Sequence, residues 1–122
     1  MLTIRKTDNQ NEIEQYCTAN NLTVPTAPAQ YMGMFDEETL CGLAAITLED
    51  TKVYLDLIYA EGGSSITHGL GKSILNMADL QGIKTVYGKN PELKKLYQLL
   101  RFKEENGEFS LSLAGYFTDH EH

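Results

Sequence analysis

The sequence predicts one domain of the α/β (α+β) class, in which a mixed, mostly antiparallel sheet carries helices on both faces. Its 122 residues suffice for one compact core and are too few for two ordinary domains. Apolar residues alternate with a period of two in most of the first half, which is typical of strands, and recur every three or four residues in two later stretches, which indicates helices. The predicted order is β-α-β-β-β-α-β-α-β over residues 1–117, followed by a loose tail at 118–122.

The first half predicts a strand, a helix and a three-stranded meander. The opening "MLTIRKT" alternates as a half-buried strand does, and a helix capped by Asp8 or Asn9 then runs to the pair Asn20-Asn21. The prolines of "TVPTAPAQ" exclude a regular helix, so residues 21–30 form a connector. The apolar runs "YMGMF", "TLCGLAAITL" and "KVYLDLIYA" are separated by acidic turns and predict three consecutive antiparallel strands.

In the second half the apolar period lengthens to three or four residues. Residues 69–80 place their large apolar side chains on one face, so we expect a helix that begins directly after His68. "IKTVYG" predicts a short strand, "NPELKKLYQLLRF" a second helix with Pro91 in its first turn, and "EFSLSLAGYF" a last strand. A strand, a helix and a further strand in succession form a βαβ unit, which requires a parallel pair of strands.

Composition restricts the partners. The formal charge of −7 argues against duplex nucleic acid, which is bound through clustered lysine and arginine. No apolar run approaches the length of a membrane span, and the polar start carries no signal peptide, so we expect no membrane partner and a cytoplasmic location. Cys17 and Cys41 lack the spacing of a metal or redox motif, so we expect two reduced cysteines and no metal site.

The stretch "ITHGLGKSIL" suggests a phosphate site, because Gly69 and Gly71 stand at the predicted start of a helix. The first backbone N–H groups of a helix are unpaired and attract anions without any basic side chain. The alternative is that Gly69 only turns the chain and Gly71 only allows tight helix packing. A nucleotide-binding P-loop is excluded, because Ile66 occupies the position of its first glycine and no later strand ends in a magnesium-binding aspartate.

Taken together, residues 40–113 resemble the GNAT superfamily of acyl-CoA-dependent N-acyltransferases. Its acyl-CoA motif, [RQ]-x-x-G-x-[GA] at a helix start, is matched at Gly69 and Gly71, with Ile66 in the Arg or Gln position. Its later motif, N-x-x-A-x-x-L-Y-x-K-x-G-F, is similar to "NPELKKLYQLLRF", in which Leu93, Leu99 and Arg101 replace the Ala, Lys and Gly of the pattern. The order and spacing of the two motifs carry the resemblance.

The resemblance implies that acetyl-CoA is a co-substrate, with its pantetheine arm inserted between two splayed parallel strands and its pyrophosphate on residues 67–72. A backbone N–H near Tyr59 would hold the thioester carbonyl, and Lys72 would add a charge-assisted contact or remain solvated. His68 is more simply a turn residue. The residues expected at the coenzyme are Tyr59, Thr67, His68, Gly69, Leu70, Gly71, Lys72 and Asn90.

The same resemblance assigns an acid and leaves the base open. Tyr97 matches the family tyrosine that protonates the departing thiolate, although an inward-facing core tyrosine would occupy the same position. Glu61 and Asp56 lie at or near the end of the strand before the glycines, where a carboxylate could relay a proton through water. Each also has a structural reading, Glu61 as a solvated strand end and Asp56 as a paired carboxylate.

The chain departs from the family at the acceptor side. Family members carry two helices between the first two strands, whereas here residues 21–30 replace the second, and little chain follows Phe117. The shortened acceptor side has three possible consequences: an open site that accepts a protein or peptide amine, a homodimer that completes the pocket, or a loss of catalysis. The sequence therefore predicts an N-acetyltransferase acting on a primary amine of a small molecule or peptide. The alternatives are a non-catalytic GNAT-like module that binds CoA or another protein, and an unrelated α+β scaffold.

Overall fold

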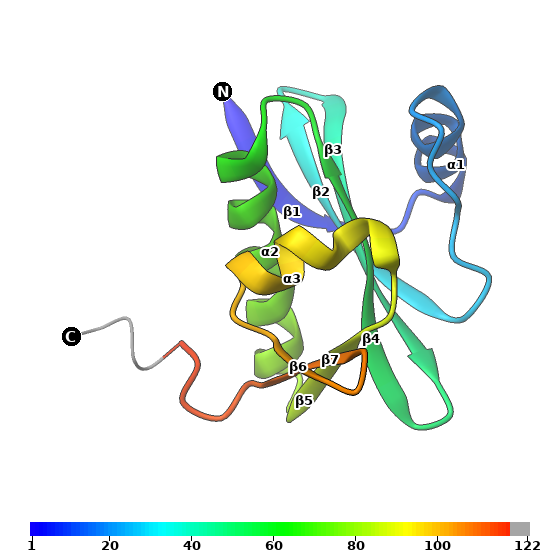
Figure 1. Ribbon diagram of the computed structural model, residues 1–122. Coiled ribbons are helices and arrows are strands. Elements are labelled where there is room, and N and C mark those ends of the chain that lie inside the picture. The colour runs from blue at the N-terminus through cyan, green and yellow to red at the C-terminus, as the bar shows by residue number, and fades with distance from the viewer. Residues whose placement is uncertain (118–122) are drawn as a thin grey trace.

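The computed structural model describes residues 1–117, and the tail predicted at 118–122 lies outside the described residues. Its strands form one sheet in the order β1-β2-β3-β4-β5-β7-β6 (Figure 1). The order is sequential up to β5, as expected for a meander followed by a βαβ unit. The strands are β1 (Leu2–Thr7), β2 (Ala29–Asp36), β3 (Thr39–Glu49), β4 (Lys52–Ala60), β5 (Thr85–Gly88), β6 (Lys103–Glu105) and β7 (Glu108–Ser112).

Helices cover both faces of the sheet, which confirms the predicted fold class. Figure 1 shows α1 (Gln10–Ala19) on one side of the sheet and α2 (Ser64–Leu80) and α3 (Lys94–Leu99) on the other. The short 3₁₀ helix η1 (Pro91–Leu93) leads into α3. Two clusters of buried apolar side chains result, a larger one between the sheet and α2 and α3, and a smaller one under α1. We refer to them as the α2 side and the α1 side of the sheet.

The predicted strand pairing is confirmed. Adjacent strands are antiparallel except β4 and β5, which are parallel and joined through α2. Asn9 caps α1 by accepting a hydrogen bond from the Glu12 amide at 3.1 Å, so the predicted helix start is also confirmed.

Two element boundaries differ from the prediction. The helix expected directly after His68 begins earlier, at Ser64, because Gly62 and Gly63 have φ angles of 107° and 101° and turn the chain out of β4 immediately. The last strand, expected over residues 108–117, ends at Ser112 as β7, and an unpredicted strand, β6, pairs with it across the two-residue turn Asn106-Gly107, where both residues adopt positive φ. An Asn-Gly pair between strand residues is a recognised hairpin signal that the sequence analysis did not use.

Candidate functional site

The candidate site lies where β4 and β5 separate. Within the described residues, these strands pair only at Val53 with Val86 and at Tyr54 with Tyr87. The rest of β4, residues 55–60, therefore has no strand partner among residues 1–117 on its β5 side. An unpaired strand edge presents backbone N–H and C=O groups that a ligand with amide groups can bind.

A β-bulge at Asp56 accompanies this separation. Ala45 of β3 pairs with Leu57 and the next residue, Ile46, pairs with Leu55, so Asp56 is an extra residue in β4. The bulge changes which side each side chain faces. Leu55 belongs to the core on the α2 side, whereas Leu57 belongs to the core under α1, although residues two apart in a regular strand share a face.

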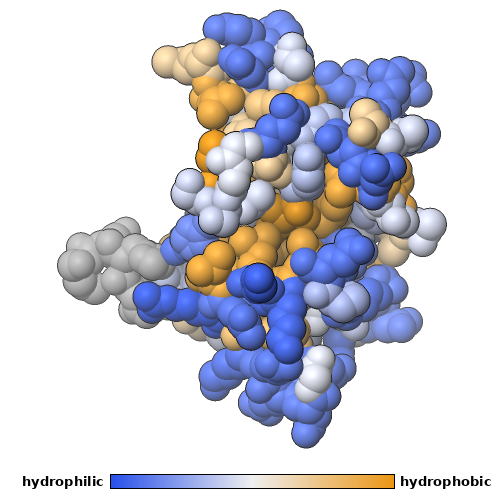
Figure 2. Space-filling model, turned by 45° about the horizontal axis from the view of Figure 1, so that its top comes forward, coloured by the Kyte–Doolittle hydropathy of each residue, from blue (hydrophilic) through white to orange (hydrophobic). Residues whose placement is uncertain are grey.

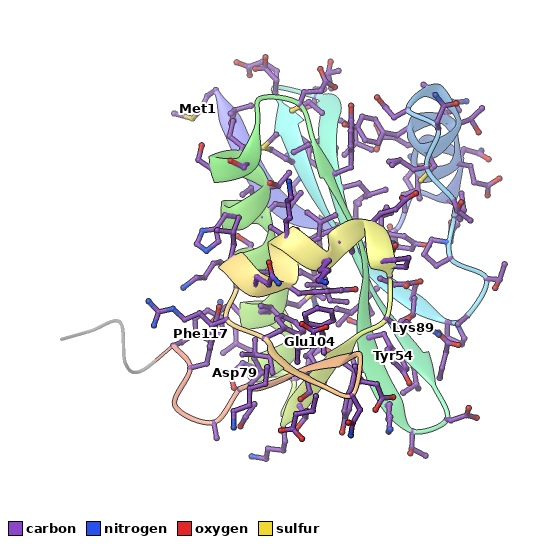
Figure 3. The ribbon with its side chains drawn as sticks, in the orientation of Figure 1. Met1, Tyr54, Asp79, Lys89, Glu104 and Phe117 are labelled. Atoms are coloured by element: carbon purple, nitrogen blue, oxygen red, sulfur yellow. The ribbon has the colours of Figure 1, made fainter. Side chains whose placement is uncertain are left out.

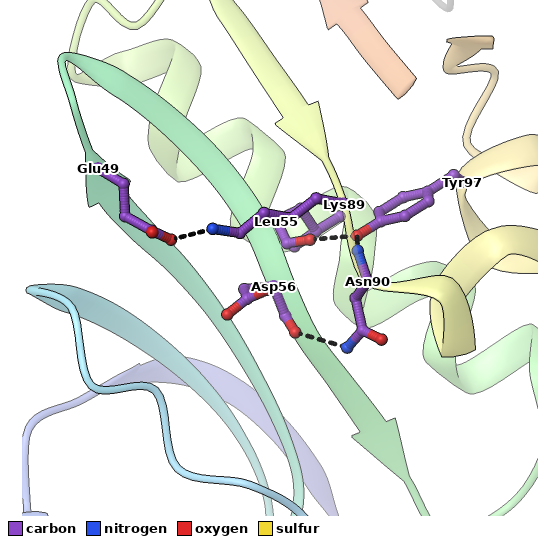
Figure 4. Close-up of polar contacts among 6 residues, drawn as sticks. All are labelled: Glu49, Leu55, Asp56, Lys89, Asn90 and Tyr97. Atoms are coloured by element: carbon purple, nitrogen blue, oxygen red, sulfur yellow. Dashed lines mark hydrogen bonds and ion pairs between the residues drawn. The ribbon is translucent and has the colours of Figure 1, made fainter. Parts of the chain in front are cut away.

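Tyr97 and Asn90 bridge the opening between the strands (Figure 4). The Tyr97 hydroxyl donates to the Leu55 carbonyl at 2.7 Å and accepts from the Asn90 amide at 3.3 Å. The Asn90 side chain donates to the Asp56 carbonyl at 3.0 Å and caps the following turn by accepting from the Glu92 amide at 3.0 Å. Two successive β4 carbonyls are thus held from the α3 side by residues of the predicted "NPELKKLY" motif.

Burial governs the acidity of the groups at this opening. Tyr97 is fully buried, and this desolvation raises the pKa of its hydroxyl to about 12. Desolvation likewise raises the pKa of the Asp56 carboxyl, and the nearby Lys89 ammonium partly opposes the shift. Lys89 itself forms an ion pair with Glu49 (Figure 4) and lies 4.4 Å from the centre of the Tyr54 ring (Figure 3).

The far end of the open β4 edge leads to the N-terminus of α2. Gly63 is the N-cap residue and makes no side-chain cap, and the first amide to bond back is that of Thr67, which donates to the Gly63 carbonyl at 3.2 Å. The amides of Ser64, Ser65 and Ile66 therefore have no partner within the helix and point out of its positive end. This first turn therefore has the unpaired amides that the sequence led us to expect at residues 67–72.

The predicted phosphate loop is therefore not at the start of the helix. The segment 67–72 lies inside α2, so the amides of Gly69, Leu70, Gly71 and Lys72 are bonded within the helix and are unavailable to an anion. The missed signal was the pair Gly62-Gly63 followed by two serines, which marks a helix start just after the strand.

The two glycines of the predicted loop have different environments. A Cβ added at Gly71 would lie 3.0 Å from a methyl carbon of Leu100 and 3.2 Å from one of Ile58, so this glycine allows α2 to pack closely on the sheet and α3. A Cβ at Gly69 would meet nothing within 4 Å among the described residues. The packing explanation for Gly71 is thus supported, and no described residue requires a glycine at position 69 on steric grounds.

The backbone amide of Tyr59 does not face the opening. The Glu61 amide donates to the Cys41 carbonyl at 3.1 Å, and in an antiparallel pair such hydrogen-bonded positions alternate. Tyr59, opposite Leu43, therefore directs its amide toward β3, and the amides of Ile58 and Ala60 face the open edge. The sequence placed this N–H near Tyr59, and the register shows that the amides facing the open edge are those of its two neighbours.

Glu61 lies at the other end of the strand from Tyr97. It follows Leu55 by six residues, which corresponds to about 20 Å at a strand rise of 3.3 Å per residue. Its side chain instead accepts a 3.5 Å hydrogen bond from Tyr16 of α1, whose hydroxyl pKa is raised by burial and by the nearby Glu61 carboxylate. The structure therefore places Asp56, rather than Glu61, beside the residue whose carbonyl Tyr97 binds, Leu55.

A cavity of about 380 Å³ opens beside Asp56 on the α1 side. The connector predicted to replace a missing helix forms its wall, and β4 and the segment before α3 contribute the rest. Leu22 and Val24 of the connector also pack against the core under α1, which holds the wall in place. The lining residues are Asn21, Leu22, Thr23, Val24, Pro25, Thr26, Asp56, Leu57, Asn90 and Glu92.

The surface above α3 is hollowed and apolar. Figure 2 shows hydrophobic side chains gathered at the centre of this face, with polar groups on either side.

Three further residues predicted at the coenzyme, Thr67, His68 and Lys72, lie on α2 after its first turn. The Thr67 hydroxyl donates to the Ser64 carbonyl at 2.9 Å, and the Lys72 ammonium lies 5.0 Å from the centre of the Tyr116 ring.

Residues 1–117 bring no three His, Cys, Asp or Glu side chains together in a manner suited to a metal ion. None of the helices in this part of the chain combines the length and the apolar character needed to cross a bilayer.

Solved structures with the same fold are numerous, although no family model matches the sequence and a comparison with curated proteins finds no match. A GNAT-family protein from Desulfovibrio desulfuricans superposes with a TM-score of 0.72 at 10% identity, covering 92% of this chain and 99% of that one. An N-acetyltransferase from Staphylococcus aureus Mu50 gives 0.69 at 17% identity, covering 91% and 96%. PaiA N-acetyltransferase from Thermoplasma acidophilum, in complex with coenzyme A, gives 0.53 at 20% identity, covering 82% and 65%. The chain has the GNAT fold.

Proposed function

We propose that this protein is an N-acetyltransferase that moves an acetyl group from acetyl-CoA to a primary amine. The observation that carries the proposal is the open edge of β4, which runs from the bulge at Asp56 to the unpaired amides at the start of α2. The Thermoplasma protein with this fold binds coenzyme A, which supports the same choice of ligand here. We take residues 1–117 as one domain and expect it in the cytoplasm, where acetyl-CoA is available.

The described residues fit the parts of acetyl-CoA. The amides of Ile58 and Ala60 would pair with the pantetheine arm along the open edge, and those of Ser64, Ser65 and Ile66 would hold the diphosphate. The open edge of β4 ends at Ala60, and Gly62 and Gly63 then turn the chain directly into α2, so the two sets of amides follow one another closely along the chain. Thr67, His68 and Lys72, along the same helix, remain candidates for contacts with the rest of the coenzyme.

When bound, the thioester supplies an activated acetyl carbon. Asp56 accepts one proton from the ammonium form of the amine, which frees the nitrogen lone pair to form the C–N bond as the C–S bond breaks. Its raised pKa makes this carboxylate a stronger base than an exposed aspartate. The Ile58 amide donates to the carbonyl oxygen as negative charge develops there. The second proton of the amine leaves with the thiol.

Tyr97 is the proposed donor to the departing sulfur. In the structure its hydroxyl donates to the Leu55 carbonyl, so this role requires it to exchange that acceptor for the sulfur. Its pKa of about 12 keeps it protonated at neutral pH. Because that pKa exceeds the ordinary value of a thiol, a hydrogen bond to the sulfur is favoured over complete proton transfer. Asn90 positions both Tyr97 and β4.

Thermal unfolding with and without acetyl-CoA, combined with an assay of thiol release, tests this proposal. Ligand at a hundredfold excess over its dissociation constant adds about 2.7 kcal/mol to the free energy of unfolding. We expect stabilisation together with amine-dependent thiol release. In ¹⁵N-labelled protein we also expect the largest amide shifts at Ile58 and Ser64 to Ile66, and smaller shifts at Gly69 to Lys72. Absence of stabilisation at millimolar acetyl-CoA would overturn the proposal.

A non-catalytic CoA-binding or interaction module is the second candidate. One observation favours it, namely that the Tyr97 hydroxyl already has a donor and an acceptor within the chain. This candidate predicts stabilisation by acetyl-CoA and by CoA, without thiol release over a panel of primary amines that includes alkyl amines and lysine peptides.

A further inference from the structure

We propose that the cavity beside Asp56 selects an aliphatic diamine, a small amine that carries a second positive charge. The inference rests on the proposed function, because it names the acceptor of that reaction. It is carried by the charges that line the cavity and by the position of the cavity at the opening between β4 and β5.

The cavity is negatively charged. Its lining contains two carboxylates, Asp56 and Glu92, and no lysine, arginine or histidine among the described residues. The nearest cation that acts on Asp56 is Lys89, which is already paired with Glu49. An anionic acceptor would therefore meet the two negative charges of the lining, whereas a dication would neutralise both.

Asp56 has a specific need for a cation. Its carboxylate is half-buried and accepts no hydrogen bond from the described residues, while its backbone carbonyl is held by Asn90. Burial of a carboxylate without a partner is unfavourable, and this is the cause of its raised pKa. A substrate ammonium at this position removes the penalty and at the same time brings the reacting nitrogen to the open edge of β4.

Glu92 marks the outer end of the cavity. It follows Pro91 at the start of the 3₁₀ helix, its amide is held by the Asn90 side chain, and its own carboxylate is exposed. The rest of the lining carries no charged side chain and includes the apolar residues Leu22, Val24 and Leu57. Two carboxylates in an otherwise uncharged cavity match two ammonium groups joined by a methylene chain.

Acceptors of equal length and different charge test the inference. The probes are 1,5-diaminopentane, 1-aminopentane and 5-aminopentanoate, assayed for kcat/KM with saturating acetyl-CoA. We expect the diamine to be preferred over the monoamine, and the amino acid to be the poorest. Glu92→Gln should lower the ratio of diamine to monoamine kcat/KM about threefold to fivefold, a modest change because an exposed carboxylate is screened by solvent.

Glu105→Gln is the matched control, since it removes the same charge from the exposed β6 strand and should leave the ratio and the activity unchanged. Binding of 1,5-diaminopentane followed by ¹⁵N amide shifts gives a readout that does not need turnover, and we expect shifts at Asp56, Leu57 and Glu92.

The outcomes separate the two proposals. Transfer to 1-aminopentane or 5-aminopentanoate with equal or better kcat/KM than to the diamine would overturn the diamine inference and leave the acetyltransferase standing. An unchanged ratio in Glu92→Gln would overturn it as well. Diamine binding at Asp56 and Glu92 without any response to acetyl-CoA would instead support the cavity assignment and contradict the acetyltransferase.

Discussion

Tyr97 connects the architecture to the proposed chemistry. Its ring lies against Gly88, where an added Cβ would come within 2.5 Å of it, and within 5.0 Å of the Phe102 and Phe109 ring centres. This packing fixes the hydroxyl between β4 and the start of α3. The same residue therefore stabilises the opening between the strands and is available to act in it.

Tyr97→Phe separates these two contributions. The substitution leaves the buried Leu55 carbonyl and the Asn90 amide without their partner, which costs about 1–3 kcal/mol in the free energy of unfolding. If the hydroxyl also serves the leaving sulfur, kcat falls by more than about tenfold. Chemical denaturation and steady-state kinetics measure the two effects.

The matched control is Tyr116→Phe. It removes a hydroxyl that lies outside the opening and donates to the Leu100 carbonyl at 2.9 Å. A loss of stability in Tyr97→Phe with unchanged kcat would leave Tyr97 a structural residue only.

The pH dependence of stability gives a second test of Tyr97. Its folded pKa of about 12 exceeds the ordinary tyrosine value of 10, so the stability that the buried neutral hydroxyl contributes is complete below pH 10 and is lost as the pH rises toward 12. The wild type should therefore lose stability relative to Tyr97→Phe between pH 10 and 11, as measured by urea unfolding.

We expect the ionised carboxylate of Asp56 to lower the stability of the fold while it serves the reaction as a base. Because its folded pKa is raised, ionisation of Asp56 destabilises the protein as the pH rises through that pKa. Asp56→Asn removes the buried charge and should raise the free energy of unfolding at pH 7 by less than about 1 kcal/mol, since the group is only half-buried. Amine acetylation should fall by about a hundredfold if Asp56 is the base.

Asp79→Asn, an exposed carboxylate on α2, controls for the change in net charge. Lower stability in Asp56→Asn at pH 7 would contradict the account of its desolvation.

At the scale of elements, α2 decides where an anion can bind. The glycine motif and the helix start do not coincide, because the strand ends at Ala60 and Gly62 and Gly63 begin the helix almost at once. The positive end of the helix thereby lies directly after the open edge of β4. A helix that began at residue 69, as expected from the glycine motif, would separate its positive end from the open edge of β4 by five further residues.

A pair of alanine substitutions tests this description of α2. Gly69→Ala should stabilise the protein by about 0.5–1 kcal/mol, because the added methyl meets open space and glycine is a poor helix former. Gly71→Ala should be at least about 1 kcal/mol less stable than Gly69→Ala, because its methyl presses on Leu100 and Ile58. Denaturant unfolding of both variants gives the difference.

The Gly69→Ala variant should retain the full stabilisation by acetyl-CoA. A selective loss of that stabilisation would place the diphosphate on the second turn of α2, as the sequence motif implied.

At the scale of the whole molecule, net charge dominates the electrostatics. The formal charge is −7, whereas the ion pairs of residues 1–117 are limited to the N-terminus with Asp36 and Glu37, and Lys89 with Glu49. These pairs are largely exposed and contribute little, so repulsion among carboxylates is the larger effect.

Salt should therefore stabilise the protein. Raising NaCl from 10 mM to 150 mM shortens the screening length from about 30 Å to about 8 Å. We expect Tm to rise by roughly 2–4 °C, which corresponds to somewhat less than 1 kcal/mol for a chain of this size. A scanning calorimetry series measures this, and a falling Tm would mean that the ion pairs outweigh the repulsion.

The sequence alone determined the kinds of elements, their order as far as the third helix, and the parallel pair around the second long helix. Local periodicity and capping carry that information, and the structure confirms the Asn9 cap, the meander and the placement of helices on both faces. Two further features have local sequence signals that the prediction did not include, namely the Asn106-Gly107 turn and the helix start after Gly62-Gly63.

Only the tertiary structure decided the composition of the candidate site. The bulge at Asp56 arises from the register between β3 and β4, and that register turns the amide of Ile58, rather than that of Tyr59, to the open edge. The distance between Glu61 and Tyr97 likewise depends on how α3 packs against the beginning of β4. Side-chain period is a property of neighbouring residues, whereas register and packing are set by contacts between residues far apart in the chain, and no local pattern encodes them.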